Sequence, residues 1–337
     1  MSVTIKDVAK KAGVTPAVVS RVLNNDSTLS IKNETRDNVI RAASELNYQP
    51  NSIARSLRSK TTGTLGMLVP DIANPYFVNI IKGAQDYALE NDMCLILINT
   101  DDIWENEKKL INVLINKKVD GILYLSAHLD IKANTLLSAG LIPYVLVNRN
   151  SVNSNTSYVG TDNFAGAYMA VQHLLSLGHT KIAHISGPLY TDTASGRLQG
   201  YFAAIKAAGF QQNPRYIIES SFTFEGGHSA AKELLSLENP PTAIFAANDL
   251  IAMGTIVSAD EMNLSVPEDL SVIGMNDIWT GKYFMPPLTT ISYDAYKMGS
   301  EACKMLINQI ANNNQDQLRI ILEPSLVIRK STAQVKK

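Results

Sequence analysis

The stretch Thr15-Pro16-Ala17-Val18-Val19-Ser20-Arg21-Val22-Leu23-Asn24 predicts a short helix that begins sharply and ends near Asn24. Thr15 is a favourable N-cap, and Pro16 suits the first helical position, where its missing N–H costs nothing. Upstream, residues 4–12 predict another short helix, with Thr4 as its cap and Asp7 in its first turn. Gly13 and Val14 form a tight turn between the two.

Two short helices joined by a glycine-containing turn are typical of a helix-turn-helix, whose second helix presents its N-terminal residues to base edges in the major groove. An ordinary helical hairpin is the alternative. Charge separates the two interpretations. Residues 1–60 hold ten Lys and Arg against five Asp and Glu, a net charge of +5, whereas the remaining residues hold 20 against 26, a net charge of −6. A basic head on an acidic body favours a nucleic-acid-binding module attached to a different kind of domain.

After residue 60, short β-branched runs alternate with amphipathic stretches, which predicts βαβ units around parallel sheets. The alternation occurs in two series, so we expect an α/β body in two halves. Ligands of open parallel sheets bind outside the carboxyl ends of the strands. The polar residues expected at those ends are Pro70-Asp71, Asn99-Thr100-Asp101, Ser126, Asn148-Arg149, Asn248-Asp249 and Asn276-Asp277.

Signals for other classes of protein are weak. The sequence has no G-x-G-x-x-G after the first strand, no phosphate-loop lysine motif and no G-x-S-x-G, which argues against a dehydrogenase, an NTPase and a hydrolase. The five histidines lack metal-ligand spacing, so we expect surface or structural roles for them and no metal or cofactor. Cys94 lies in an apolar run and is expected to be a buried, inert thiol. With no signal pattern and no membrane-spanning run, a cytoplasmic protein is expected.

Motifs along almost the whole chain resemble those of the lactose-repressor and galactose-repressor (LacI/GalR) family of bacterial transcription regulators. In the head they are Thr4-Ile5-Lys6-Asp7-Val8-Ala9, Gly13-Val14-Thr15, Val19-Ser20-Arg21-Val22-Leu23-Asn24 and the segment 48–57. In the body they include residues 70–77, 160–163, 177–179, 197–201, 245–249, 272–274, 286–291 and 326–329. Their order and spacing make the resemblance specific.

The resemblance implies a small all-α helix-turn-helix head, residues 1–49, a hinge helix and linker, residues 50–61, and an α/β body, residues 62–337, with a two-subdomain periplasmic-binding-protein-like fold. We expect the N-subdomain to comprise about 62–161 and 291–321, and the C-subdomain about 162–290 and 322–332. The resemblance to this family further implies a homodimer that binds palindromic double-stranded operator DNA and represses carbohydrate-utilisation genes. A sugar or sugar phosphate is implied to control this homodimer as its effector.

For DNA binding, Arg21 is the strongest candidate base reader, because its guanidinium can pair with O6 and N7 of guanine. A phosphate contact is the alternative. Pro16 and Ala17 offer only apolar contact, for example to a thymine methyl group. Leu57 is implied to be an apolar wedge in the minor groove, on a hinge helix too short to be stable alone. The full set of expected DNA-binding residues is Thr4, Ile5, Thr15, Pro16, Ala17, Ser20, Arg21, Asn24, Asn51, Ala54, Arg55 and Leu57. The loop Asn25–Ile31 is about two residues longer than usual in the family.

For the effector, the residues at or near family pocket positions are Asn74, Tyr76, Phe77, Asn148, Arg197, Asn248, Asn276 and Tyr293. Aromatic faces, amides and one arginine fit a polyhydroxylated or phosphorylated ligand. Asn at strand ends also caps helices, which is the alternative role for several of them. Two other hypotheses remain open at this point. The first is a sugar-binding carrier without a DNA role, which the basic head makes less favourable. The second is an enzyme, although no group of residues in the sequence indicates a catalytic site.

Overall fold

The computed structural model describes residues 3–24, 26, 28–48, 61–129, 135–137, 142–151, 156–312 and 317–336. The chain divides into two compact units, Met1–Thr62 and Gly63–Lys337. The first is helical, and the second contains two β-sheets with helices on both faces of each.

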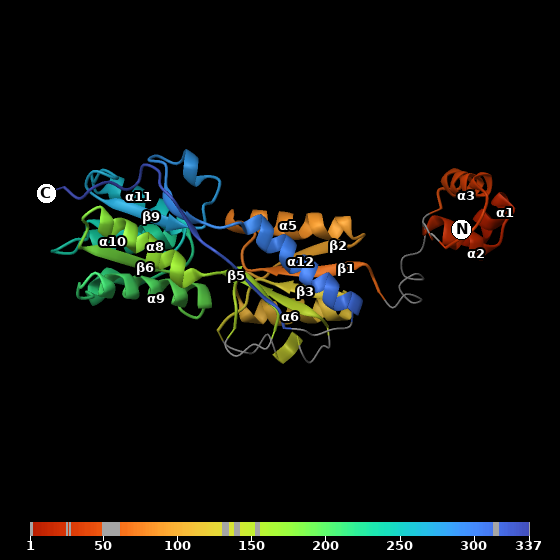
Figure 1. Cartoon of the computed structure of the whole chain (residues 1–337), viewed down its shortest axis with the longest axis horizontal. Coiled ribbons are helices and arrows are strands. Elements are labelled where there is room, and N and C mark those ends of the chain that lie inside the picture. Colours follow the sequence, from red (N-terminus) through yellow and green to blue (C-terminus); the bar gives the residue numbers. More distant parts are fainter. Residues whose placement is uncertain are drawn as a thin grey trace. The chain divides into compact units, whose positions relative to one another are not determined.

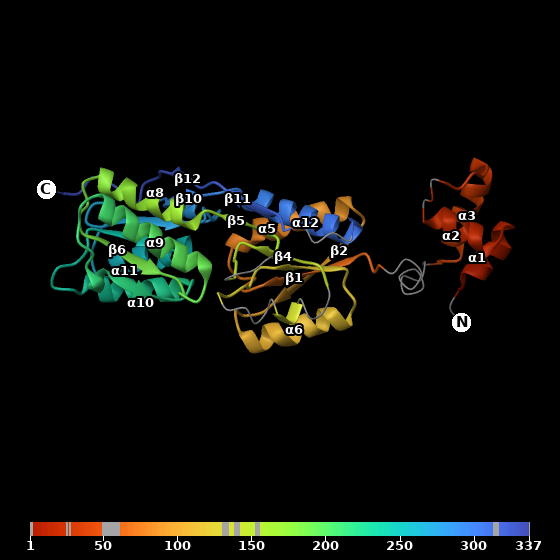
Figure 2. The same ribbon diagram turned by 60° about the horizontal axis from the view of Figure 1, so that its bottom comes forward.

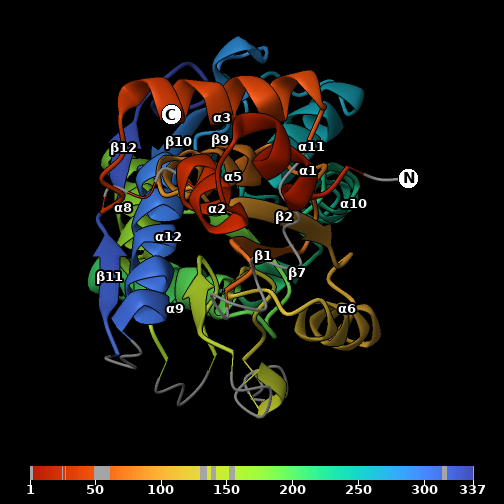
Figure 3. The ribbon, with the colours of Figure 1, turned by 90° about the vertical axis from the view of Figure 1, so that its right-hand side faces the viewer.

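The described part of the first unit contains the helices α1 (Ile5–Ala12), α2 (Pro16–Leu23) and α3 (Asn33–Glu45), which pack against one another (Figure 3). Both the backbone N–H and the hydroxyl of Thr4 donate to Asp7 Oδ2, at 2.8 and 2.7 Å, and hold the start of α1. Gly13 ends α1 with a φ of 69°, a left-handed conformation that glycine adopts without strain. The bounds expected for both helices are confirmed.

The first sheet of the second unit has the strand order β11-β5-β4-β3-β1-β2, with every pair parallel. Leu65 in the centre faces Leu95 on one side and Gly121 on the other. Helices α5 (Tyr76–Glu90) and α12 (Ala295–Asn312) cover one face and α6 (Trp104–Asn116) the other (Figures 1 and 2). We call this part the first lobe. Its strands are β1 (Thr64–Val69), β2 (Cys94–Asn99), β3 (Gly121–Tyr124), β4 (Tyr144–Val147), β5 (Tyr158–Thr161) and β11 (Arg319–Leu322).

The second sheet, in what we call the second lobe, has the order β12-β10-β9-β8-β6-β7, and only the β10–β12 pair is antiparallel. Its strands are β6 (Ile182–Ser186), β7 (Ile217–Glu219), β8 (Ala243–Ala246), β9 (Ser271–Met275), β10 (Thr289–Ser292) and β12 (Ser325–Val327). Helices α8 (Asn163–Ser176) and α9 (Asp192–Ala207) cover one face, and α10 (Phe224–Leu235) and α11 (Asp249–Glu261) the other (Figure 2). Short 3-10 turns occur at η1 (Pro214–Tyr216) and η2 (Gly281–Tyr283).

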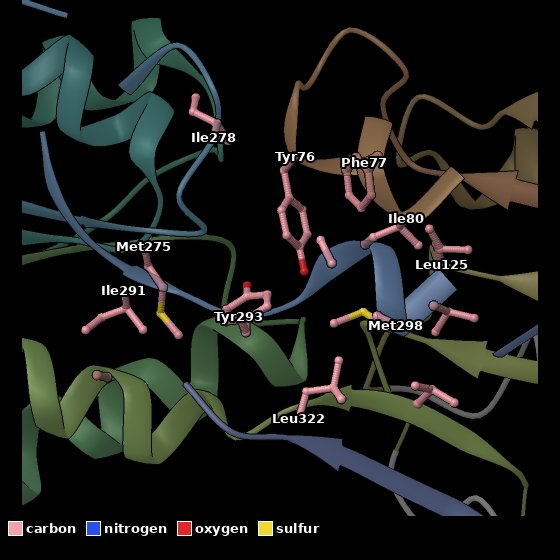
Figure 4. Close-up of a cluster of buried hydrophobic side chains, with 14 of the residues drawn as sticks. Tyr76, Phe77, Ile80, Leu125, Met275, Ile278, Ile291, Tyr293, Met298 and Leu322 are labelled. Carbon is pink, nitrogen blue, oxygen red and sulfur yellow. The ribbon is translucent and has the colours of Figure 1, made fainter. Parts of the chain in front are cut away.

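The chain passes between the lobes three times, from β5 to α8, from β10 to α12 and from β11 to β12 (Figure 1). The second passage differs from our expectation of a boundary at 290/291. Ile291 pairs with Met275 and with Leu326 in the second sheet, so the chain leaves that lobe only after Ser292. Around the passages, Tyr76 and Tyr293 lie between apolar side chains of both lobes in one continuous core (Figure 4).

Cys94 is exposed, so the expected buried thiol is wrong at this position. Its strand, β2, lies at the edge of the first sheet beside β1, and an apolar sequence does not reveal the order of strands. Cys303 is buried, and burial raises the pKa of its thiol to about 12. Among the residues that the structure describes, no helix is both long and apolar enough to cross a membrane.

Candidate functional site

The first turn of α2 exposes the small side chains predicted for the DNA groove. Thr15, Pro16 and Ala17 are exposed, while Val19 and Val22 are buried against α1 and α3. The Thr15 hydroxyl accepts the Val18 N–H at 3.4 Å and caps the helix. One face of α2 therefore packs in the core and leaves its N-terminal end free to contact a groove.

Arg21 projects from the last turn of α2 with its side chain 43% exposed. Its Nε donates to Asp26 Oδ2 at 2.6 Å and its Nη2 to Thr28 Oγ1 at 2.8 Å. Asn24 caps the helix end, and its Nδ2 donates to the Ser20 carbonyl at 2.6 Å. The longer loop, whose contacts the sequence does not predict, thus bonds directly to the predicted base reader.

Of the other predicted DNA-binding residues, Thr4 is exposed and Ile5 is half-buried at the start of α1. The predicted hinge residues Asn51, Ala54, Arg55 and Leu57 lie outside the described residues.

The second unit contains a cavity of about 380 Å³ where the carboxyl ends of both sheets meet. Its walls follow β1, β2 and β4 in the first lobe and β6, β7, β8 and β9 in the second, as expected for open parallel sheets. Seven of the eight predicted effector residues line it, namely Asn74, Tyr76, Phe77, Asn148, Arg197, Asn248 and Asn276. Tyr293 lies behind them, bonded to Asn276.

Two tyrosine–asparagine pairs fix the floor of the cavity. The Tyr76 hydroxyl donates to Asn148 Oδ1 at 2.8 Å, and the Tyr293 hydroxyl donates to Asn276 Oδ1 at 2.6 Å. Asn148 and Asn276 both have a positive φ, 64° and 116°, a conformation costly for most residues and less so for Asn. Because each amide oxygen is already bonded, each side-chain N–H₂ remains as the group that can donate to a ligand.

Arg197 lines the cavity but is largely buried in its wall, with only 2% of its surface exposed. Nε donates to Asn163 Oδ1 at 2.9 Å, Nη1 donates to the Ala247 carbonyl, and Nη2 lies 3.3 Å from the Tyr293 hydroxyl. Its guanidinium also lies 5.9 Å from the centre of the Phe222 ring. Most of its donors are therefore used within the protein.

Asn248 is both a helix cap and a cavity-lining residue. Its Oδ1 accepts the Ile251 N–H at 2.8 Å and caps α11, while its side chain also lines the cavity. The neighbouring Asp249 is buried, and burial raises the pKa of this carboxyl group to about 6. Asp249 accepts hydrogen bonds from Thr290 and from the Ile278 N–H, so it holds the loop after β9 in place.

A charged group of residues forms one end of the cavity. Arg149 Nη1 lies 2.6 Å from Asp102 Oδ1, which is also 3.2 Å from His128 Nε2. The Tyr190 hydroxyl donates to Asp102 Oδ2 at 3.0 Å. Burial by itself raises the pKa of Asp102, but the hydrogen bond with His128 and the charge of Arg149 outweigh it and hold that pKa well below its usual range. Asp102 is therefore ionised at neutral pH.

Glu107, on α6, completes this group beneath Asp102. It is fully buried and accepts the Tyr124 hydroxyl at 2.6 Å, and burial raises its pKa. Its Oε1 lies 3.6 Å from His128 Nε2 and accepts no hydrogen bond from the described residues. Burial by itself lowers the pKa of His128, but the hydrogen bond with Asp102 and the charge of Glu107 raise it overall.

Ligand-type atoms of Asp102, Glu107 and His128 lie within 4.8 Å of one another. The Arg149 guanidinium already occupies the cationic position beside Asp102. We therefore interpret the group as an ion-pair network and not as a metal site.

The comparisons with known proteins match both units. A family described as "Bacterial regulatory proteins, lacI family" matches residues 4–51, and "Periplasmic binding protein-like domain" matches residues 171–332. An HTH-type transcriptional repressor PurR of Mannheimia succiniciproducens is 37% identical over 98% of this chain and 99% of its own. That of Histophilus somni (strain 2336) is 38% identical over 97% of this chain and 98% of its own. The chain belongs to the LacI family.

Solved structures of this family agree in fold. The Lac repressor dimer bound to operator and the anti-inducer ONPF has a TM-score of 0.88 and 28% identity, covering 99% of this chain and 100% of that one. A complex of the transcriptional regulator CelR with cellobiose has a TM-score of 0.76 and 31% identity, covering 98% and 99% of the two chains. This LacI-family chain is a DNA-binding transcriptional repressor and not an enzyme.

Sequence reasoning missed part of the cavity wall in this LacI-family protein. The sequence did carry a signal for Asp101 and Arg149, because both belong to the polar residues expected at strand ends. Phe222 and Tyr190 lie on loops after β7 and β6 and carry no motif. Asp102 is 47 residues from Arg149 and 88 residues from Tyr190 in the sequence, and only the folded chain brings them together.

Proposed function

We propose that this repressor binds a palindromic operator as a homodimer and responds to a small carbohydrate bound in the cavity between its lobes. The observation that carries the proposal is the cavity itself, which lies at the carboxyl ends of both sheets and is lined by four asparagines and four aromatic rings. Amides that donate and accept, beside aromatic faces, suit a ligand with many hydroxyl groups.

A neutral sugar fits this cavity better than a sugar phosphate. Arg197, the residue expected to hold a phosphate, donates to Asn163 and to the Ala247 carbonyl, and Arg149 pairs with Asp102. Among the relatives, CelR was solved with cellobiose, and a LacI-family regulator of Enterococcus faecium, 31% identical over 81% of this chain and 100% of its own, was solved with bound ribose. Cellobiose and ribose are the ligands of those proteins, and they support a carbohydrate as the ligand here.

For DNA, we propose that α2 lies in the major groove, with Arg21 on a guanine and Pro16 and Ala17 in apolar contact with the base edges. The hinge segment then forms its helix on the operator, with Leu57 as the minor-groove wedge. The side chains of Pro16 and Ala17 cannot form hydrogen bonds with bases. Arg21 therefore makes most of the direct base contacts, and the sequence-dependent shape of the DNA supplies much of the remaining specificity.

The homodimer is supported by apolar side chains that single-chain packing leaves exposed. Edge strand β2 and helix α5, which pack together, expose Ile96, Leu97, Val78 and Leu89, by 40 to 60%. In the second lobe, Trp279, Tyr283 and Met285 are exposed by 62 to 82%. Exposed apolar residues in such number mark a protein interface, and a two-fold dimer would match a two-fold operator.

Two measurements on the full-length chain test this function. A thermal-shift screen with sugars and sugar phosphates should identify compounds that raise the melting temperature, since a ligand of the native state stabilises it. Phosphorylated sugars as the only hits would contradict the neutral-sugar assignment. A gel shift should then show salt-sensitive binding to a palindromic duplex that the hit compound alters.

A further inference from the structure

Asp26, in the loop after α2, holds one edge of the Arg21 guanidinium. Arg21 Nε donates to Asp26 Oδ2 at 2.6 Å, and Arg21 Nη2 donates to Thr28 Oγ1 at 2.8 Å. Nε–H and one Nη2–H point to the same side of the planar group, so these two contacts occupy its side edge. The loop is itself tied to the helix end, because the Asp26 N–H donates to the Arg21 carbonyl at 3.0 Å.

The two acceptors also hold each other. Asp26 Oδ1 accepts the Thr28 N–H at 2.9 Å and the Thr28 hydroxyl at 2.7 Å. The Thr28 hydroxyl therefore donates to Asp26 and accepts from Arg21, which fixes its orientation. The hydrogen bond from Arg21 holds the pKa of Asp26 well below its usual range, so the carboxylate stays charged near neutral pH.

The end edge of the guanidinium carries one Nη1–H and the second Nη2–H. This end edge has the fork geometry that pairs with O6 and N7 of a guanine. A side chain that is 43% exposed would otherwise sample several rotamers, and ordering them on DNA binding costs conformational entropy.

We propose that Asp26, assisted by Thr28, is a positioning residue that presents the end edge of Arg21 to a guanine and so sets base specificity at that operator position. The proposal rests on the base-reading role proposed above for Arg21. It also explains why an acidic residue is placed beside the reading helix of a basic head, where its charge repels DNA phosphates.

Electrostatics alone predicts that loss of the Asp26 charge strengthens binding to all duplexes equally, whereas positioning predicts a loss of discrimination between duplexes. The full-length protein first selects a preferred duplex from a random-sequence library. The affinities for that duplex, and for the duplex with the selected guanine replaced, are then measured by fluorescence anisotropy for the wild type, Asp26→Ala, Thr28→Val and Arg21→Ala. Asp37→Asn, an exposed acidic residue on α3, is the charge-matched control.

Positioning predicts that Asp26→Ala lowers the discrimination between the two duplexes by about fivefold to tenfold, that Thr28→Val lowers it less, and that Asp37→Asn leaves it unchanged. The proposal is overturned if Asp26→Ala discriminates between the two duplexes as well as the wild type does. This includes the outcome in which Asp26→Ala strengthens binding to both duplexes equally, which is the effect expected of Asp37→Asn. If Arg21→Ala also keeps the discrimination, the base-reading role fails with it. A melting curve for each variant confirms that the head is folded.

Discussion

Tyr190 of the second lobe donates its phenol hydrogen to Asp102 of the first lobe, at 3.0 Å, across one side of the cavity. Its carbonyl accepts the Leu129 N–H at 2.8 Å, and its ring lies 4.8 Å from that of His128. These contacts are separate from the three chain passages that connect the lobes. Tyr190 therefore ties the lobes together beside the proposed effector, and its contacts must change if the lobes open.

The first prediction concerns Tyr190→Phe, which removes the hydroxyl and keeps the ring. We expect affinity for the sugar identified by thermal shift to fall about three- to tenfold, because a hydrogen bond to a charged group is lost on a half-exposed side chain. Isothermal titration calorimetry measures the change. Tyr168→Phe on α8, which removes a hydroxyl away from the cavity, is the control, and equal effects of the two variants would refute the role of Tyr190.

The second prediction concerns pH. Because the pKa of His128 is raised in the folded protein, its contribution to stability is fully present below its unfolded pKa of about 6.5 and is lost as the pH rises through the folded value. The charged groups that set this pKa are Asp102, Glu107 and Arg149. We therefore expect His128→Gln to destabilise the body more at pH 6 than at pH 8.5.

Urea denaturation at both pH values measures this difference. Asp192 and Asp249, whose pKa values burial raises to about 6, also change the stability with pH, but they do so equally in both proteins. If the difference in free energy of unfolding between the wild type and His128→Gln is the same from pH 6 to 8.5, protonation of His128 does not contribute to stability.

The third prediction concerns Arg197→Met. The variant keeps an apolar stem but removes the donors bonded to Asn163 and to the Ala247 carbonyl, both in the buried interior. We expect the free energy of unfolding to fall by roughly 3 kcal/mol, since buried acceptors are left without partners. Arg215→Met, at an exposed position, should change it by less than about 0.5 kcal/mol. Comparable losses in the two variants would contradict the structural role of Arg197.

The fourth prediction concerns the dimer. Leu97→Asp places a charge on the exposed face of edge strand β2, where we propose that a second copy packs. Light scattering should show the wild type at twice the chain mass of 36.8 kDa and the variant as a monomer with weaker operator binding. Phe210→Asp, equally exposed in the second lobe, should remain dimeric. A wild-type protein that is monomeric at micromolar concentration would refute the proposed interface.

Local signals predicted much of this fold. The caps at Thr4 and Thr15, with Pro16 and Gly13, set the helices of the head correctly because capping acts over three or four residues. The alternation of strands and helices predicted two α/β halves, and polar residues at strand ends pointed to the cavity.

What the sequence did not predict depends on contacts between distant segments. The position of β2 at a sheet edge exposes Cys94, and neither hydropathy nor periodicity encodes strand order. Asp102, His128 and Tyr190 belong to three separate loops, so their network has no sequence signature. The contact between Arg21 and Asp26 spans only five residues, yet no capping or turn rule predicts it from the sequence.

Control of operator binding by the cavity can be measured on the full-length chain. The affinity of the full-length chain for its selected operator is determined at fixed salt, with and without a saturating concentration of the sugar that raises its melting temperature. If the cavity controls operator binding, the sugar changes operator affinity by at least fivefold, in either direction. An affinity that stays the same within twofold, with the sugar demonstrably bound, would contradict it.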